Sequence, residues 1–307
     1  MDDCLTRDNN GRYKIVPLVS MKPMLKQAQS QKYAIAAFNM IDYNSARAIV
    51  DGATELNAPI IVQVSVKTIK LWGHKPIADW VRGLAEGTHT PVALHLDHCK
   101  DLDVIKGCID AGWTSVMYDG SAYPYEENVA KTRAAYDMAQ AAGVGLEAEI
   151  GAIGGTEDDK FVAEDEAILA KVDECIAFCK ELPDLAVFAP AIGTAHGEYK
   201  GQPKIAYERL EQIVAMTGMP IALHGGTGLT NEQFHRCINS GCAKVNISTM
   251  HKKQFIEAFV GLRQKEPKQK EPIPFIQAQY EAMKADVRDM VKTFGSAERA
   301  GEAAAAA

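Results

Sequence analysis

Eight short apolar, β-prone runs recur along this 307-residue chain, and longer amphipathic segments separate them. The predicted strands are residues 33–40, 59–65, 91–98, 115–119, 144–151, 186–193, 220–225 and 244–247. Strands that are apolar throughout, each followed by a helix, are typical of a parallel sheet that is covered on both faces. Eight such units predict an α/β fold of the (β/α)8, or TIM-barrel, type.

The segments between these runs have the periodicity of helices. They cover residues 44–56, 77–86, 102–111, 126–142, 165–180, 207–217 and 231–240, with further helices expected at 24–31, 250–263 and 276–294. Several begin after a capping residue and end at glycine, as in the helix between Thr230 and Gly241. An open, doubly wound sheet is the alternative fold, but the G-x-G-x-x-G turn that usually follows its first strand is absent.

The length suits a single barrel domain over residues 1–299 with helical extensions at both ends, followed by a tail at 300–307. Residues 265–274, which are rich in Lys, Gln and Pro, are expected to form an exposed linker. The net charge of −7 and the pI near 5.7 argue against nucleic acid or an anionic membrane as the main partner.

No apolar run approaches the roughly 20 residues of a membrane-spanning helix, and the acidic N-terminus does not resemble a secretory signal. Seven scattered cysteines suggest reduced thiols rather than a disulfide framework. These features favour a cytoplasmic protein.

Residues suited to catalysis gather where the predicted strands end, which is where the active site of a (β/α)8 barrel lies. Imidazoles follow strands three, six and seven, and carboxylates lie nearby: His98, His196 and His224, with Asp97, Asp119 and Glu149. Three imidazoles that converge with a fourth position open form the ligand set of a catalytic zinc. The alternative is that each histidine is an isolated polar residue at a strand end.

A glycine-rich segment, Gly225-Gly226-Thr227-Gly228, follows the seventh predicted strand, and Asn246-Ile247-Ser248-Thr249 follows the eighth. In this architecture the loops after strands seven and eight form the usual phosphate site, because glycine lets backbone N–H groups approach the phosphate oxygens closely. The sequence therefore predicts a phosphorylated substrate.

Taken together, these motifs resemble the class II fructose-bisphosphate/tagatose-bisphosphate aldolase family over about residues 22 to 260. The motifs that carry the resemblance are Asp97-His98, Asp119-Gly120-Ser121, Gly154-Gly155-Thr156-Glu157-Asp158, His196-Gly-x-Tyr-Lys, His224-Gly-Gly-Thr-Gly and Asn246-Ile-Ser-Thr. The resemblance implies an aldehyde-lyase that reversibly cleaves a ketose (bis)phosphate to dihydroxyacetone phosphate and an aldehyde.

The resemblance also implies roles for individual residues. His98, His196 and His224 would bind Zn²⁺, Asp97 would be the general acid/base, and Glu157 would assist proton transfer from a mobile loop. Asp119 and Glu149 would orient the zinc ligands or offer an alternative metal position. The phosphate-binding residues would be Gly197, Lys200, Gly225, Gly226, Thr227, Asn246, Ile247, Ser248 and Thr249. A monovalent cation, Na⁺ or K⁺, and a homodimer or homotetramer are common among such relatives.

Ser248 and Met250 depart from the pattern of that family at positions near the substrate's C4 hydroxyl. Fructose-bisphosphate enzymes usually have Asp at the Ser248 position, tagatose-bisphosphate enzymes usually have Ala, and an acidic residue is usual at the Met250 position. The substrate is therefore left open between these two sugars and a related sulfo- or deoxy-ketose phosphate. Lys67, Lys70 and Arg299 are candidates for binding a second phosphate.

Three other functions fit the sequence less well. A Schiff-base aldolase needs a desolvated lysine at the carboxyl end of a strand, whereas Lys244 begins one. A metallohydrolase of the amidohydrolase type would carry His-x-His on its first strand, which instead contains Ala36-Ala37-Phe38-Asn39. A barrel that binds sugar phosphate without catalysis is the third, and Asp97 and Glu157 argue against it.

Overall fold

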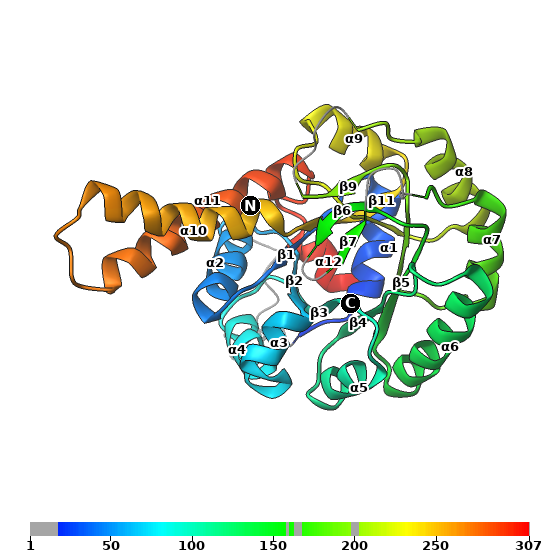
Figure 1. Cartoon of the computed structure of the whole chain (residues 1–307), viewed down its shortest axis with the longest axis horizontal. Helices are drawn as coiled ribbons and strands as arrows, with labels where there is room; N and C mark the ends of the chain where they lie inside the picture. Colours follow the sequence, from blue (N-terminus) through cyan, green and yellow to red (C-terminus); the bar gives the residue numbers. More distant parts are fainter. Residues whose placement is uncertain (1–17, 158–159, 163–167, 198–202, 307) are drawn as a thin grey trace.

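The computed structural model describes residues 18–157, 160–162, 168–197 and 203–306. Eight parallel strands form a closed barrel: β1 (Ile35–Asn39), β2 (Ile60–Ser65), β3 (Val92–Cys99), β4 (Ser115–Tyr118), β5 (Gly145–Ile150), β8 (Val187–Pro190), β10 (Ile221–Leu223) and β11 (Cys242–Ile247). Their order around the barrel is β1-β11-β10-β8-β5-β4-β3-β2 (Figure 1). Each corresponds to one predicted strand, so the predicted barrel is confirmed and the open sheet is excluded.

Helices surround the barrel (Figure 1). They are α2 (Tyr43–Thr54), α3 (Val66–Trp72), α4 (His74–Glu86), α5 (Leu102–Asp110), α6 (Tyr125–Ala142), α7 (Val172–Glu181), α8 (Tyr207–Thr217), α9 (Asn231–Asn239), α10 (Thr249–Lys265) and α11 (Ile273–Thr293). Outward-facing strand residues such as Phe38, Val62 and Leu94 pack with the inner faces of these helices in one continuous apolar core. Burial of this apolar surface is the main favourable contribution to folding.

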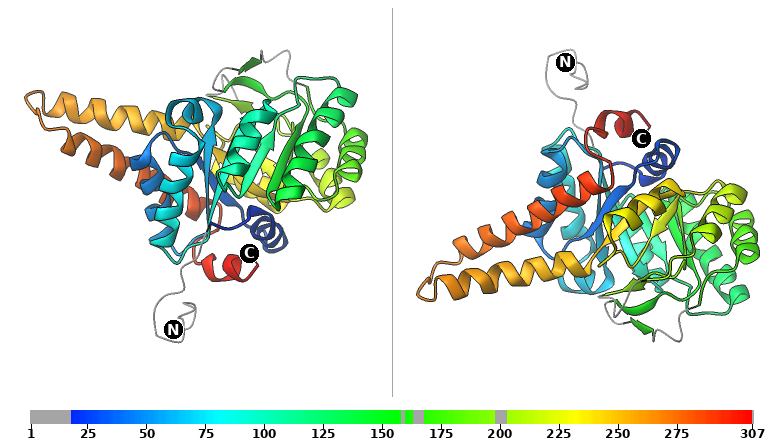
Figure 2. Two further views of the ribbon diagram at one scale, coloured as in Figure 1. Left: turned by 90° about the horizontal axis from the view of Figure 1, so that it is seen from below. Right: turned by 90° about the horizontal axis from the view of Figure 1, so that it is seen from above.

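Helices α10 and α11 extend well beyond the barrel as an antiparallel hairpin (Figures 1 and 2). The predicted linker joins them at the tip, where most residues between 264 and 273 are exposed. Helix α3 was not predicted, because it follows β2 without a break. Ser65 marks its start, since the Ser65 hydroxyl accepts a hydrogen bond from the backbone N–H of Thr68 at 3.5 Å.

Inside the barrel, small apolar side chains fill the end at which the strands begin. Ala37, Ile61 and Ala93 belong to a second apolar cluster, which includes Met24 and Leu25 of helix α1 (Met21–Gln31). Helix α1 closes this end by packing in that cluster. The Gln29 side chain also donates a hydrogen bond to the backbone of Met219, just before β10. The opposite end, where the strands terminate, is left for polar groups.

Residues 300–306, the described part of the predicted tail at 300–307, are helical. Ala300–Ala306 form helix α12, which lies beside α1 at the closed end of the barrel (Figure 2). Ala303 is completely buried in the cluster of α1, so packing adds to the strong helix propensity of alanine. Arg299, at the start of this helix, forms an ion pair with Glu302. Because α12 lies at the closed end of the barrel, Arg299 is away from the predicted phosphate site.

A small sheet at the other end of the barrel was not predicted either. It consists of β6 (Gly154–Glu157), β7 (Lys160–Val162) and β9 (Ala195–His196), in the order β7-β6-β9. Strand β8 ends at Pro190, so His196 lies on β9 and not at the end of the sixth barrel strand. Among the described residues, no helix combines the length and hydropathy needed to cross a membrane.

Candidate active site

The end of β3 brings two consecutive side chains to the same site. In a regular strand Asp97 and His98 would point to opposite faces. Here the pairing of β3 with β4 shifts between Leu96 and Cys99, because three residues of β3 advance against two of β4. His98 also has a left-handed backbone, with φ of 45°, which is uncommon for a residue other than glycine. This bulge lets the carboxylate and the imidazole face the same barrel mouth.

Three imidazoles converge at this mouth, as predicted. The ring centroid of His98 lies 5.2 Å from that of His196 and 4.7 Å from that of His224, and the last two are 6.1 Å apart. One nitrogen from each ring lies within 4.8 Å of the other two, so the three can bind one metal ion. His196 and His224 are buried, and the His98 side chain is 12% exposed.

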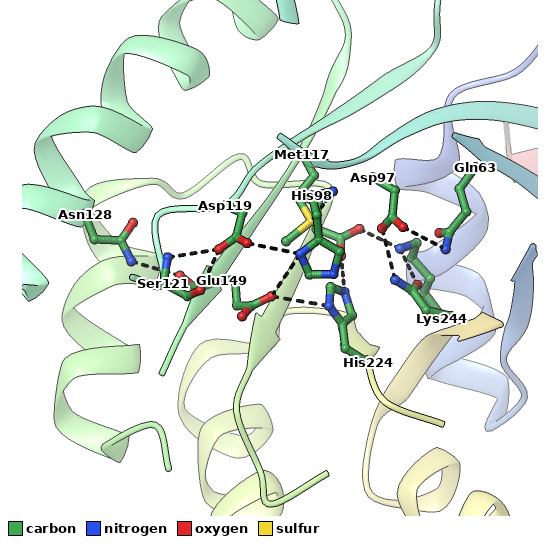
Figure 3. Close-up of polar contacts among 12 residues, drawn as sticks. Gln63, Asp97, His98, Met117, Asp119, Ser121, Asn128, Glu149, His224 and Lys244 are labelled. Atoms are coloured by element: carbon green, nitrogen blue, oxygen red, sulfur yellow. Dashed lines mark hydrogen bonds and ion pairs between the residues drawn. The ribbon is translucent and has the colours of Figure 1, made fainter. Parts of the chain in front are cut away.

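Two buried carboxylates lie beside the imidazoles. His98 Nδ1 is 3.2 Å from Asp119 Oδ2 and 3.8 Å from Glu149 Oε2, and His224 Nδ1 is 3.3 Å from Glu149 Oε2 (Figure 3). The hydroxyl of Ser121 donates to Asp119 Oδ1 at 2.6 Å and orients that carboxylate. His98, Asp119 and Glu149 form a second group that can hold a metal ion.

His224 bridges the candidate metal site and a buried carboxylate below it. Its Nε2 lies 2.7 Å from Glu147 Oε1, which leaves Nδ1 directed toward Glu149 and the other imidazoles. Burial alone would lower the pKa of His224, but the hydrogen bonds with Glu147 and Glu149 outweigh burial and raise the pKa to about 9. A metal ion at Nδ1 would replace the proton there, because a ligand imidazole is neutral at the coordinating nitrogen.

Glu147 itself is fully buried and ionised. Burial raises its pKa, but the Lys244 ammonium 2.9 Å away, together with His224 and His95, lowers it well below the usual value. His95 Nε2 lies 3.2 Å from Glu147 Oε2. Burial and the charge of Lys244 lower the pKa of His95, which favours its neutral form. A negative charge on Glu147 therefore balances the positive charge on Lys244 inside the barrel.

Asp97 is buried beside the candidate metal site and is oriented by three amide side chains. Its Oδ2 accepts hydrogen bonds from Asn39 at 2.8 Å and Gln63 at 3.4 Å, and its Oδ1 accepts one from Asn246 at 3.3 Å. These donors come from β1, β2 and β11, and Figure 3 shows Gln63 beside Asp97. A carboxylate fixed in this way is suited to proton transfer at an atom bound next to the metal.

The glycine-rich loop lies beside the same mouth. Gly225 has a φ of 68°, and a Cβ there would lie 2.5 Å from the carbonyl oxygen of Ala195, so only glycine fits. Ser248 precedes α10, whose 17 residues begin at Thr249 with backbone N–H groups available to an anion. Ile247 packs its side chain into the outer core, so only its backbone remains for ligand contacts.

Two predicted site residues cannot be placed by their side chains. Glu157 ends β6, two residues after Gly155, which pairs with His196 in the small sheet, but its side chain lies outside the described part of the structure. Lys200 falls in 198–202, which also lies outside the described residues.

The sequence predicted no role in this site for five buried polar residues: Asn39, Gln63, His95, Glu147 and Lys244. Lys244 entered only as the lysine that a Schiff-base aldolase would need. Asn39 is the last residue of β1, and the other four lie inside strands, where a polar residue alone does not show which side chains it meets across the barrel. The signal was alternation by two residues, as in Glu147 with Glu149 and Lys244 with Asn246, because such pairs share one face of a strand.

Known proteins resemble this chain along almost its full length. Residues 19–299 match the family described as "Fructose-bisphosphate aldolase class-II". A fructose-bisphosphate aldolase from Geobacillus stearothermophilus is 40% identical over 93% of this chain and 99% of its own length. One from Staphylococcus aureus is 38% identical over 93% of this chain and all of its own length.

A solved structure agrees with the fold. The YdjI aldolase from Escherichia coli K12 superposes with a TM-score of 0.81 at 24% identity, covering 92% of this chain and 99% of that one. The resemblance of the sequence to the class II enzymes and the predicted enzyme class, an aldolase, are both confirmed. This protein belongs to the class-II fructose-bisphosphate aldolase family.

Proposed function

We propose that this protein reversibly cleaves a ketose bisphosphate to dihydroxyacetone phosphate and an aldehyde, with fructose bisphosphate as the first substrate to test. The observation that carries the proposal is the convergence of His98, His196 and His224 on one point beside the buried Asp97 carboxylate. The names of the relatives from Geobacillus and Staphylococcus support the choice of sugar.

We assign the metal as Zn²⁺, bound by His98, His196 and His224. Three neutral imidazoles suit zinc and leave an open position for a substrate oxygen. When bound, zinc would act as a Lewis acid on the ketose carbonyl. Asp119 and Glu149 orient the imidazoles by contacts with His98 and His224, or take part in an alternative metal position.

Asp97 would act on the C4 hydroxyl. Its carboxylate takes the hydroxyl proton as the C3–C4 bond breaks, the electron pair of that bond remains with C3, and C4 becomes the aldehyde carbon. In the direction of condensation Asp97 returns the proton to the aldehyde oxygen. Glu157 would deliver a proton to C3 and so complete dihydroxyacetone phosphate.

The loops after β10 and β11 would bind the phosphate of the dihydroxyacetone end. Gly197, Gly225, Gly226 and Thr227 would line one side of the phosphate, and the segment from Asn246 to Thr249 would line the other. Lys200 and a monovalent cation, Na⁺ or K⁺, would balance the phosphate charge. Fixing the phosphate also fixes the reacting carbons relative to Asp97 and the metal ligands.

The identity of the sugar is a separate question, because Ser248 and Met250, which depart from the family pattern, lie at the start of α10. Ser248 is buried and Met250 packs partly against the core. A panel of fructose, tagatose, sulfo- and deoxy-ketose phosphates, scored by release of dihydroxyacetone phosphate, identifies the preferred substrate by its kcat/KM.

The experiment that tests the reaction combines chelation with reduction. We expect EDTA to abolish cleavage of fructose bisphosphate and Zn²⁺ to restore it, whereas borohydride added with substrate leaves the activity unchanged. Inactivation by borohydride together with insensitivity to EDTA would identify a Schiff-base mechanism and contradict the proposal. Lack of cleavage for every sugar phosphate at full zinc occupancy would favour a binding protein.

We further propose a homo-oligomer assembled through the α10/α11 hairpin. Ile256, Phe259, Val260, Ile273 and Ile276 of this hairpin are each at least 39% exposed, so a second copy of the chain would cover apolar surface. Sedimentation velocity of the purified protein and of a Phe259→Glu variant measures the oligomeric state of each. We place the protein in the cytoplasm, in keeping with the six free cysteines among the described residues.

A further inference from the structure

The ammonium group of Lys244 lies between the two halves of the candidate active site. The side chain is fully buried, and Nζ is 2.9 Å from Glu147 Oε2 and 2.6 Å from Asn246 Oδ1. Glu147 contacts the candidate metal ligand His224 at 2.7 Å, and Asn246 donates to Asp97 at 3.3 Å. One cation therefore connects the metal half of the site with the acid/base half. Figure 3 shows Lys244 near both His224 and Asp97.

This connection crosses the interior of the barrel. Lys244 is on β11 and Glu147 on β5, and these strands are not neighbours in the barrel order. Both side chains are completely inaccessible to solvent. Desolvating two charges costs several kcal/mol per ion, and a buried ion pair is often no more stable than an apolar pair of similar volume. A contribution to folding alone therefore gives a weak account of this pair.

We propose that Lys244 is a positioning residue of the aldolase reaction, which orients His224 through Glu147 and Asp97 through Asn246. The inference rests on the proposed function, since it assumes that His224 binds the metal and that Asp97 transfers the proton. Lys244 would act through these two residues, Glu147 and Asn246, which Nζ contacts directly.

The hydrogen-bonding capacity of lysine explains the effect on Asn246. An ammonium group only donates hydrogen bonds, so the amide oxygen of Asn246 must face Lys244. The amide nitrogen then faces the opposite way, toward Asp97 Oδ1. A neutral side chain in place of Lys244 would allow the Asn246 amide to rotate, and Asp97 would lose one of its three donors.

A similar argument applies to His224. A carboxylate only accepts hydrogen bonds, so Glu147 fixes the proton of His224 on Nε2 and leaves Nδ1 for the metal. Lys244 balances the charge of Glu147 and holds its other oxygen at 2.9 Å. Contacts of this kind around metal ligands commonly change metal affinity or activity by about 10- to 100-fold.

The test compares Lys244→Met, the double variant Lys244→Met/Glu147→Gln and the control Lys284→Met. Lys284 pairs with Glu55 at 3.0 Å and its side chain is only 12% exposed, but it lies on α11, away from the site. Each protein is measured for zinc dissociation constant, kcat and KM per zinc-loaded molecule, melting temperature, and the visible spectrum of its Co²⁺ form. Lys244→Met alone leaves the buried charge of Glu147 unpaired and could prevent folding. The double variant removes both charges and so serves if the single variant does not fold.

We expect both Lys244 variants to bind zinc about 10-fold more weakly or worse and to lose about 10-fold or more in kcat, with KM changed by less than about threefold. Their Co²⁺ spectra should differ from that of the native protein, and Lys284→Met should match the native protein in every respect except melting temperature. A folded double variant with native zinc affinity, Co²⁺ spectrum and kcat would overturn the proposal.

Failure of the proposed function gives a different result. In that case the native protein cleaves no ketose phosphate at full zinc occupancy. Zinc affinity and the Co²⁺ spectrum still test the position of His224 then, and native values in the Lys244 variants would overturn the positioning role on their own.

Discussion

The interior of the barrel consists of two layers that differ in chemistry although the same strands supply both. Ala37 and Ile61 lie in the apolar layer next to α1, whereas Asn39 and Gln63, two residues further along the same strands, lie in the polar layer next to the metal site. A step of two residues keeps a side chain inside the barrel and moves it one layer toward the mouth. The same alternation of inward-facing residues therefore supports stability at one end of the barrel and chemistry at the other.

The two layers also differ in how their side chains are fixed. Packing alone orients the apolar layer, so a change in volume is felt mainly as a change in stability. Hydrogen bonds and charges orient the polar layer, where Asp97, Glu147 and Lys244 each contact at least two other side chains. Changes there should therefore affect function more than folding.

The largest effect is expected for Asp97→Ala in the polar layer. Loss of a general acid/base should lower kcat by roughly 10²- to 10⁴-fold, because no other group takes the C4 hydroxyl proton. Zinc content, measured by atomic absorption, should stay at the native level, because the three imidazoles remain. Full activity in this variant would refute the assigned role, and Asp103→Ala, which removes an exposed carboxylate on α5, serves as the control.

Ile61→Ala in the apolar layer should lower stability and leave kcat unchanged, the reverse of Asp97→Ala. It leaves a cavity next to α1 and should lower the free energy of unfolding by about 2 to 5 kcal/mol, measured by urea denaturation of the metal-free protein. We expect kcat per folded molecule to remain near the native value. Met216→Ala, at a side chain that is 64% exposed, should change stability by less than about 0.5 kcal/mol. A large loss of kcat with unchanged stability in Ile61→Ala would contradict the division between the layers.

A smaller effect is expected from pH on zinc binding. The pKa of His224 is raised to about 9, above the roughly 6.5 of an unfolded chain, so its proton stabilises the metal-free protein below pH 6.5 and that contribution is lost as the pH rises through 9. Zinc must displace this proton, so its apparent affinity should rise about tenfold per pH unit between 7 and 9.

Calorimetric titration with zinc at pH 7.5, in two buffers of different ionisation enthalpy, counts the protons released. We expect about one proton per zinc for the native protein and for Ile61→Ala, because the apolar layer does not contact His224. Glu147→Gln removes the main hydrogen bond that raises the pKa of His224, so its proton release should be smaller. Equal release by native protein and Glu147→Gln would exclude the assigned cause of the shift.

The fold could be predicted because its signals are local. Apolar runs such as residues 59–65 and 91–98 correspond to β2 and β3, and the predicted capping residue Thr230 precedes α9, where it forms a capping box with Gln233. The small sheet was missed because its strands are only two to four residues long, and α12 was missed because an alanine-rich terminus gives no sign of the surface that buries it.

Some features of the site also follow from local sequence signals, and others do not. The sequence by itself determined that His98 and His224 stand at the ends of barrel strands. The structure brings them together with His196, which lies on β9 and not at the end of the sixth barrel strand, and with Asp119 and Glu149. Only the tertiary structure decided that His98 turns inward at a bulge and that Lys244 reaches across to Glu147. The physical reason is that strand order along the chain is a local property, whereas a contact between residues 97 positions apart exists only once the barrel has closed.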